Sequence, residues 1–215
     1  KTHFVDEDTI ARFLEASESS HYRYLFELIL YTGLRRGEVI GLKWSDISDG
    51  VIRIRRNITK YGLGTLKTES ALRDIPLSES AVSCLFDQYH YLSKSKIISP
   101  WVFPQTKGKS DITVNAVQHA FARVKEQTAE WKKIGRKYHG ELISPAVEFT
   151  LHDLRHTFAS RATEFMDLKQ LQYIMGHTDA KTTMQIYAEA HKSQIKNAAV
   201  HIDSMWSWKT KIVSM

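Results

Sequence analysis

The chain has 215 residues, of which 25% are charged and 42% are hydrophobic. This composition excludes a disordered chain, and no apolar run approaches the ~20 residues that are needed to cross a bilayer. Lysine and arginine exceed aspartate and glutamate by 30 to 24, which gives a net charge of +6 and favours a polyanionic partner such as nucleic acid. The length indicates one domain with a conventional core.

Cysteine content and the first residues bear on the compartment. Cys84 is the only cysteine, so an intrachain disulfide is impossible and a reducing compartment is indicated. Its apolar neighbours predict that Cys84 packs in the core. The polar start KTHFVDEDT lacks the apolar stretch of a signal peptide, so we expect a cytoplasmic protein. Because the first residue is not methionine, we expect the chain to be a fragment of a longer protein.

The first third of the chain has apolar residues at helical spacing. Asp6 or Asp8 can cap a first helix, and Gly33 is well placed to end a second one. A third, short helix is expected over residues 36–42. From Val51 the apolar period changes to two, which predicts a small antiparallel sheet up to Pro76.

Helical spacing returns in the second half of the chain. We expect one helix over residues 80–93 and another from a Thr113 cap to residue 124. The polar and basic stretch 127–148 contains Gly140 and Pro145, so we interpret it as a variable loop or a partly helical insertion. The remainder predicts four helices, over residues 152–164, 168–175, 180–189 and 191–204.

Four separated segments of the chain carry the candidate site residues: YTGLRRGEVIGLKWSDI, LKTESALRDIPL, LHDLRHTFAS and LQYIMGHTDAKTTMQIYAE. Together they resemble the tyrosine recombinase and integrase family, which includes the phage integrases. They occur in the family's order and span Tyr31 to Glu189. The resemblance implies an α+β, mainly helical catalytic fold with a small antiparallel sheet near residues 51–77. It also implies that residues 1–215 are the catalytic domain, without the N-terminal core-binding domain and any arm-binding domain.

The implied reaction is cleavage and rejoining of DNA through a phosphotyrosine. Tyr187 would attack the scissile phosphate, become linked to the 3′ end and release a 5′ hydroxyl. A phenol has a pKa near 10, so only ~0.1% of it is ionised at neutral pH and the site must assist its deprotonation. The chain has nine tyrosines, and Tyr187 matches the family's nucleophile because it lies ten residues beyond His177.

Two arginines and two histidines match the positions that bind the phosphate in this family. Arg35 and Arg155 match its two invariant arginines, whose planar, always charged guanidinium groups suit the non-bridging phosphate oxygens. His152 lies three residues before Arg155, so both share one helical face and can reach a single phosphate. The resemblance gives His152 a hydrogen-bonding or acid–base role, and His177 a hydrogen bond to a phosphate oxygen.

The remaining positions concern the leaving group and the support of the site. Lys67 resembles the strand lysine that protonates the departing 5′ oxygen, and Lys60 is its rival in the same predicted hairpin. Glu38 matches an acidic position and is expected to orient an arginine or a neighbouring helix. Arg36 is expected to point elsewhere. Asp153 and His156 are expected to cap or support the helix that carries them.

Other readings of these motifs stay open at this stage. HDLRH is similar to the zinc-protease motif HExxH, although no third ligand is obvious, and GLGTLKT comes near a P-loop. A type IB topoisomerase would share the chemistry of the site. A DNA-binding protein that keeps the fold without catalysis would share its surface.

The family resemblance also implies partners. We expect a bacterial or phage-encoded, nucleoid-associated enzyme that needs no cofactor or metal and has no membrane partner. It would bind double-stranded DNA and integrate or excise a mobile element or prophage. The full-length protein would form a homotetramer on paired DNA sites, with accessory DNA-bending or directionality proteins. The apolar stripe after Tyr187 would pack on its own chain or on a neighbouring protomer.

Overall fold

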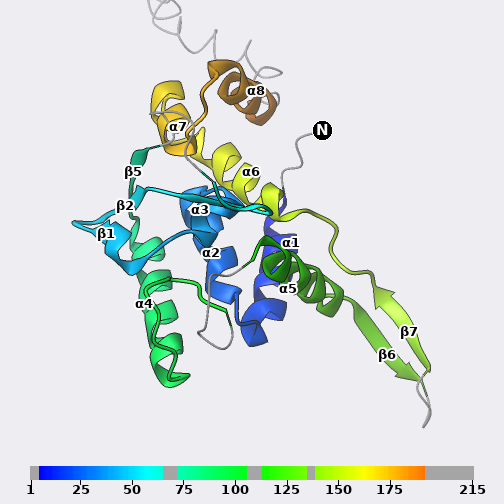
Figure 1. The fold of residues 1–215 in the computed structure, drawn as a ribbon. Helices are drawn as coiled ribbons and strands as arrows, with labels where there is room; N and C mark the ends of the chain where they lie inside the picture. The colour runs from blue at the N-terminus through cyan, green and yellow to red at the C-terminus, as the bar shows by residue number, and fades with distance from the viewer. Residues whose placement is uncertain (1–4, 65–71, 106–112, 135–138, 192–215) are drawn as a thin grey trace, which may run out of the picture.

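Helices make up most of the fold, and short strands lie beside them (Figure 1). The structure is a computed structural model that describes residues 5–64, 72–105, 113–134 and 139–191. Within these ranges no helix is long and apolar enough to span a lipid bilayer. The prediction of a mainly helical fold with a small antiparallel sheet is confirmed.

The first three helices follow the sequence signals. Helix α1 spans Glu7–Ala16, and the Asp6 side chain caps it by accepting a hydrogen bond from the Thr9 amide. Helix α2 spans Arg23–Thr32 and ends at Gly33, whose φ of 65° lies in the left-handed region that favours glycine. A 3₁₀ turn, η1, separates them, and α3 is a short helix after α2. Their bounds are Ser17–Ser19 for η1 and Arg36–Ile40 for α3.

The small sheet lies where the period of two predicted it. Its three strands pair antiparallel in the order β1-β2-β5, and a separate hairpin of β3 and β4 leaves it. Ile52 of β2 faces Ile75 of β5, and both side chains are buried. The bounds are Trp44–Asp46 for the preceding turn η2, then Ile47–Ser48, Val51–Ile54, Asn57–Thr59, Gly62–Gly64 and Arg73–Pro76 for β1 to β5.

Five further helices complete the body, and all lie close to their predicted ranges. The Thr113 side chain caps α5 as expected, by accepting a hydrogen bond from the Ala116 amide. The predicted last helix, 191–204, lies outside the described residues apart from its first position. The bounds are Glu79–Lys94 for α4, Val114–Gln127 for α5, Leu151–Ala162 for α6, Leu168–Met175 for α7 and Ala180–Ala190 for α8.

The prediction of a loop or partly helical insertion over residues 127–148 is wrong. Strands β6, Glu130–Ile134, and β7, His139–Ser144, form an antiparallel hairpin that projects from the body (Figure 1). Arg12 of α1 anchors its base, because one guanidinium nitrogen contacts the Thr128 carbonyl and the Ser144 hydroxyl. Pairing between the two strands satisfies their backbone hydrogen-bonding groups.

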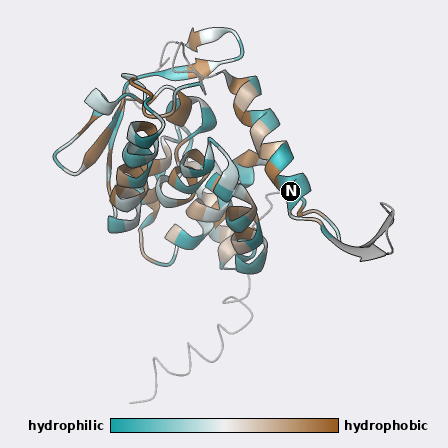
Figure 2. Cartoon of the chain, turned by 90° about the horizontal axis from the view of Figure 1, so that it is seen from below, coloured by the Kyte–Doolittle hydropathy of each residue, from teal (hydrophilic) through white to brown (hydrophobic). Residues whose placement is uncertain are grey.

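An aromatic cluster forms the centre of the core. Rings of Phe13, Phe26, Phe121 and Phe149 pack with centroid separations between 4.9 and 5.6 Å, and so join α1, α2 and α5 to the segment before α6. Hydrophobic and hydrophilic residues alternate along the helices, as expected for amphipathic helices around one core (Figure 2). Cys84 is buried, as predicted.

A second, smaller apolar cluster holds α8. Ala159 of α6, Leu171 and Met175 of α7, and Ile186 of α8 are buried against one another. This cluster fixes the last described helix on the α6–α7 pair. The histidine turn between α7 and α8 is therefore held close to α6.

Candidate active site

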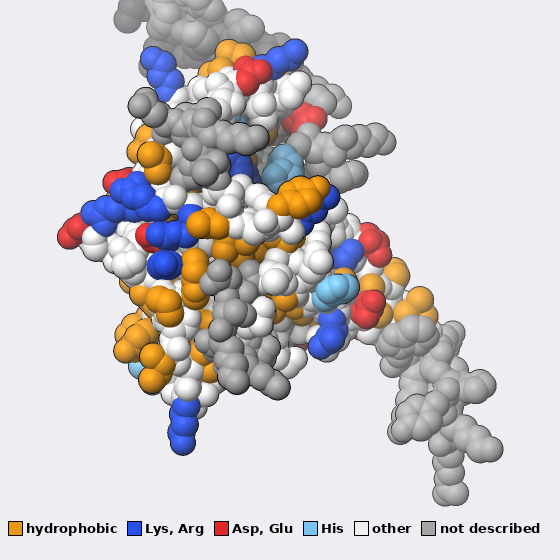
Figure 3. All heavy atoms as spheres, viewed as in Figure 1, with side chains coloured by type: hydrophobic (Ala, Val, Ile, Leu, Met, Phe, Trp, Pro, Cys, Tyr) orange, Lys and Arg blue, Asp and Glu red, His pale blue; other side chains and the backbone are white. Residues whose placement is uncertain are grey.

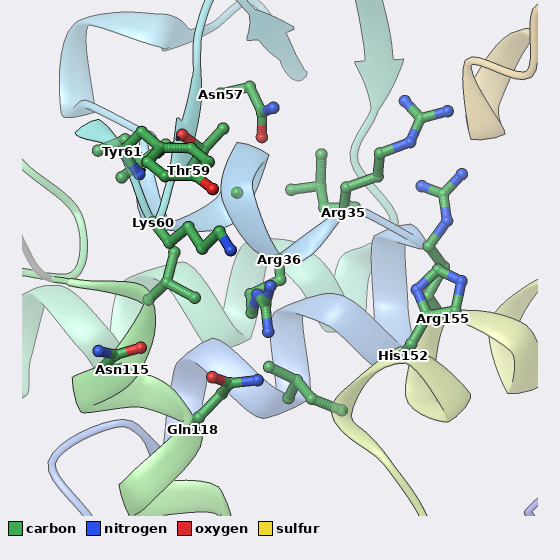
Figure 4. Close-up of a pocket in the computed structure, with 15 residues that line it drawn as sticks. Arg35, Arg36, Asn57, Thr59, Lys60, Tyr61, Asn115, Gln118, His152 and Arg155 are labelled. Atoms are coloured by element: carbon green, nitrogen blue, oxygen red, sulfur yellow. Dashed lines mark hydrogen bonds between the residues drawn. The ribbon is translucent and has the colours of Figure 1, made fainter. Parts of the chain in front are cut away.

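A hollow of about 830 Å³ opens where α3, the β3–β4 hairpin, α5 and α6 meet. Figure 4 shows the guanidinium groups of Arg35 and Arg155 side by side at one end of it and Lys60 toward the other. His152 lines the same hollow beside Arg155. The space-filling view shows histidine and arginine or lysine side chains next to each other below the α7–α8 region (Figure 3). The hollow is therefore strongly cationic.

Arg155 is buried, with only 2% of its surface exposed, and it connects two helix ends. Its Nη1 donates to the Gly33 carbonyl after α2, and its Nη2 donates to the Met175 carbonyl at the end of α7. Carbonyls at helix C-termini carry partial negative charge, so they stabilise the guanidinium. Burial, together with the positive charge of Arg35, lowers the Arg155 pKa to about 9, which leaves the group charged at neutral pH.

Arg35 lies just before α3 and depends on Glu38. Glu38 accepts hydrogen bonds from the Arg35 amide at 2.8 Å and from its Nη1 at 2.9 Å. The other guanidinium nitrogen of Arg35 donates to the Gly176 carbonyl. These contacts anchor one side of the guanidinium, whose side chain keeps 37% of its surface exposed toward the hollow. An anionic group in the hollow can therefore reach it.

Glu38 has a second arginine partner, Arg73 of β5, which the sequence analysis missed. Two parallel hydrogen bonds of 2.9 Å join the buried Arg73 guanidinium to the buried Glu38 carboxylate, and Arg73 Nε donates to the Ile174 carbonyl of α7 at 2.8 Å. Burial alone would raise the Glu38 pKa, but the hydrogen bonds and charge of Arg73 hold it below its ordinary value. Arg73 thus ties α3, β5 and α7 together.

His177 lies in the turn after α7, which has the hydrogen bonds of a Schellman motif. The Gly176 amide donates to the Tyr173 carbonyl and the His177 amide to the Gln172 carbonyl, with Gly176 at a φ of 59°. The His177 ring lies between two side chains: Nε2 is 3.3 Å from Arg155 Nη2, and Nδ1 is 2.9 Å from the Thr183 hydroxyl. Partial burial and the positive charges of Arg155 and Arg35 lower the His177 pKa to about 4.

His152 begins α6, and its neighbours keep it neutral. Its ring packs edge-on against His156 with centroids 4.4 Å apart. Displacement of water by surrounding atoms, then the charges of His156 and Arg155, lower the His152 pKa to about 4. Asp153 accepts hydrogen bonds from the Thr150 amide and hydroxyl, so it caps the helix as expected. Among the described residues no group of three or more His, Cys, Asp or Glu side chains is arranged to hold a metal ion.

Tyr187 lies on α8, and its hydroxyl is engaged outside the hollow. It donates a hydrogen bond to the Met166 carbonyl in the α6–α7 connection, and the ring stacks on His191 with centroids 5.8 Å apart. Loss of surrounding water and the nearby carboxylate of Asp167 raise the Tyr187 pKa. In this conformation a smaller fraction of the phenol is ionised at neutral pH than in water.

The structure therefore brings together most of the predicted site residues. Arg35, His152 and Arg155 share the hollow, His177 joins them through Arg155, and Glu38 supports Arg35. Tyr187 is not among the residues that line the hollow. Lys67 lies outside the described residues, while its rival Lys60 lines the hollow. Arg36 also lines it, with its guanidinium turned away from Arg35 toward Gln118 of α5 (Figure 4).

Two contributors, Arg73 and Thr183, were not predicted. Arg73 and Ile75 are two residues apart on one strand, so both side chains lie on its buried face. An arginine on a buried face indicates a buried acidic partner. Thr183 gives no comparable signal, because threonine is common in helices near their first turns. Only the folding of α8 onto α6 and α7 brings Thr183 to His177.

Two guanidinium groups and His152 line one open hollow and His177 lies beside Arg155, an arrangement that suits a phosphate or a similar anion. Residues 3–194 match the model of the phage integrase family. The chain belongs to the phage integrase family.

Individual relatives agree with this assignment. The XerC-like tyrosine recombinase of Caldanaerobacter subterraneus subsp. tengcongensis is 25% identical over 222 residues, which cover 94% of this chain and 54% of the relative. The chain spans about half the length of the curated relatives it matches.

Solved structures share the fold. The Tn1549 transposon integrase in complex with circular intermediate DNA matches with a TM-score of 0.70 at 23% identity. The matched region covers 92% of this chain and 67% of the integrase chain. A chain of a lambda integrase tetramer bound to a Holliday junction matches with a TM-score of 0.58 at 22% identity. The matched region covers 87% of this chain and 48% of the lambda integrase chain. At these identities the likeness concerns the fold alone.

Proposed function

We propose that residues 1–215 are the catalytic domain of a tyrosine recombinase, which integrates or excises a mobile element or prophage by cutting and rejoining DNA at specific sites. The observation that carries this proposal is that three separate parts of the chain meet here: Arg35 and the pair His152 and Arg155 line one hollow, and His177 contacts Arg155. A phosphodiester bound there would meet both guanidinium forks. Removing either fork should lower the cleavage rate by on the order of 10² to 10³, as for other preorganised charge stabilisers.

In the proposed reaction, the Tyr187 oxygen forms a bond to phosphorus while the bond from phosphorus to the 5′ oxygen breaks. The His152 pKa of about 4 belongs to the DNA-free protein; the negative charge of a bound phosphodiester would raise it, and His152 is proposed to accept the phenol proton in that complex. Lys67 is proposed to give a proton to the leaving oxygen. A 5′ hydroxyl of another strand then reverses the step and frees Tyr187. The hydrogen bond from Tyr187 to the Met166 carbonyl must break before the phenol can attack.

The lining of the hollow also fits the edges of DNA bases. Arg36, Asn115 and Gln118 line it. Arginine pairs well with guanine, and asparagine and glutamine pair well with adenine, in the major groove. The net charge of +6 favours phosphate contacts on either side. Double-stranded DNA is thus the proposed partner, as in the Tn1549 integrase complex.

Assembly and location follow from the same proposal. Recombination exchanges two duplexes, so four copies of the full-length protein would act together, as in the lambda integrase tetramer on a Holliday junction. Accessory DNA-bending or directionality proteins would assist that assembly. The bacterial origin of the XerC-like relative supports action in the cytoplasm, on the nucleoid.

The test is covalent trapping on a nicked duplex. The full-length protein is incubated with a pool of nicked duplexes of random sequence, and a denaturing gel separates protein–DNA adducts, whose DNA is then sequenced. We expect an adduct at a 3′ phosphate that is absent from Tyr187→Phe. Tyr89→Phe, an exposed tyrosine on α4, is the matched control and should form the adduct. Sequence-selective binding without any adduct would instead support a catalytically silent DNA-binding protein.

A further inference from the structure

Thr183 is a fully buried threonine that the reaction proposed above does not use. It lies on α8, and its side chain is within 2.9 Å of His177 Nδ1. The neighbouring Thr182 is exposed, so the two threonines provide a buried residue and a matched surface control. A buried hydroxyl opposite a histidine ring nitrogen can accept a hydrogen bond from it or donate one to it, so it can hold the ring in either tautomer.

The surroundings of the ring fix its protonation in the DNA-free protein. A guanidinium group has only donors, so Arg155 Nη2, at 3.3 Å, requires a lone pair on His177 Nε2. A neutral imidazole then carries its proton on Nδ1, which donates to the Thr183 oxygen. The lowered His177 pKa of about 4, which partial burial and the charges of Arg155 and Arg35 produce, agrees with a neutral ring.

Binding of a phosphate would reverse this requirement. A phosphate oxygen is an acceptor, so His177 must present Nε2–H to it and keep the lone pair on Nδ1. A threonine hydroxyl can donate as well as accept, so Thr183 can supply the hydrogen that Nδ1 then needs. The proton leaves Nδ1 and another arrives at Nε2 through solvent, so the ring stays neutral throughout.

We propose that Thr183 is a positioning residue that holds the His177 ring in both tautomers, as acceptor in the DNA-free protein and as donor when His177 binds a phosphate oxygen. The catalytic part of this inference rests on the proposed function. Thr183 and Tyr187 are four residues apart on one helix, so they lie on the same face. A shift of α8 that releases Tyr187 therefore acts directly on the hydrogen bond to His177.

The test uses Thr183→Val, which keeps the shape but removes the hydroxyl, and Thr183→Ser, which retains it. Nitrogen-15 NMR of the histidine rings in the DNA-free protein reports the tautomer, and the His177 signal is identified by its absence from His177→Gln. Because Arg155 favours the Nδ1–H tautomer with or without the Thr183 hydroxyl, we expect that tautomer in all three proteins. In Thr183→Val the Nδ1 proton has lost its acceptor, so we expect its nitrogen-15 signal to shift and the proton to exchange faster with water, whereas Thr183→Ser keeps the wild-type signal. Thr182→Val should match the wild type.

The second readout is the rate of covalent adduct formation on the nicked duplexes. We expect a loss on the order of tenfold for Thr183→Val, recovery to within about twofold for Thr183→Ser, and no change for Thr182→Val. A Thr183→Val variant with the wild-type Nδ1 signal and rate would overturn the inference, as would a serine variant that behaves like the valine variant. If the wild type forms no adduct, the proposed function fails, while the NMR measurement still decides the tautomer.

Discussion

Replacement of Arg73 by methionine should destabilise the fold, because it leaves the buried Glu38 carboxylate without its main partner. Arg73→Met removes two hydrogen bonds of 2.9 Å to Glu38 and one of 2.8 Å to the Ile174 carbonyl. Breaking a buried ion pair from one side costs about 3–5 kcal/mol, since the remaining charge stays desolvated. A typical domain has about 5–15 kcal/mol of stability in total, so the loss is large.

The loss should depend on pH in a defined direction. In the wild type the folded-state pKa of Glu38 lies below its ordinary value of 4.5, so the pair stabilises the fold above about pH 4.5. This contribution disappears as the pH falls through the lower folded-state pKa. In Arg73→Met, burial acts without that counterweight and raises the pKa of Glu38. The difference between variant and wild type should therefore be largest at neutral pH and shrink toward pH 4.

Urea unfolding between pH 4 and 7.5 measures this difference. The matched control is Arg53→Met, an arginine of the same sheet that pairs with the exposed Asp49 and should lose at most about 1 kcal/mol. A loss below about 1 kcal/mol for Arg73→Met at pH 7 would refute the reasoning. An equal loss at every pH would show that packing, rather than the charge of Glu38, carries the effect.

Three further predictions concern the site. Arg155→Lys removes the forked guanidinium group that donates to the Gly33 and Met175 carbonyls. The rate of adduct formation on nicked duplexes should therefore fall by a factor on the order of 10² to 10³. A fall of less than tenfold would contradict this role. Gly176→Ala places a side chain at a φ of 59°, and its Cβ would lie 2.8 Å from Arg73 Nη1. The free energy of unfolding, measured by thermal denaturation, should fall by about 1–3 kcal/mol. An unchanged melting temperature would count against the close packing. His152 and His177 have folded-state pKa values of about 4, below the ordinary value of 6.5. Between pH 4 and 6.5 the unfolded state therefore binds more protons than the folded state, so the free energy of unfolding should rise with pH across this range. NMR signals of the two rings that titrate near pH 6.5 would argue against this.

Much of the fold could be predicted from the sequence because its signals are local. Asp6 and Thr113 cap the helices they were expected to cap, and Gly33 ends α2 in the left-handed conformation. The change of period at Val51 predicted the sheet, since side chains alternate between two faces of a strand. Each of these signals lies within a few residues of the structure that it specifies.

The hairpin of β6 and β7 could not be predicted in the same way. Its strands lack a clear alternation of apolar and polar residues, because the hairpin projects from the body instead of covering the core. Its stability depends on pairing between two strands and on Arg12 at its base. Neither contribution appears as a pattern within either strand.

The same division applies to the site. The resemblance of the motifs to the family predicted Arg35, His152, Arg155 and His177 as site residues and supplied their expected roles. Tertiary structure decided which groups support them: Arg73 reaches Glu38 across 35 positions, and Arg35 reaches the Gly176 carbonyl across 141. It also decided that the Tyr187 hydroxyl contacts the Met166 carbonyl. The physical reason is that caps and periodicity depend on neighbours along the chain, whereas a buried charge takes the partner that packing brings within hydrogen-bond distance.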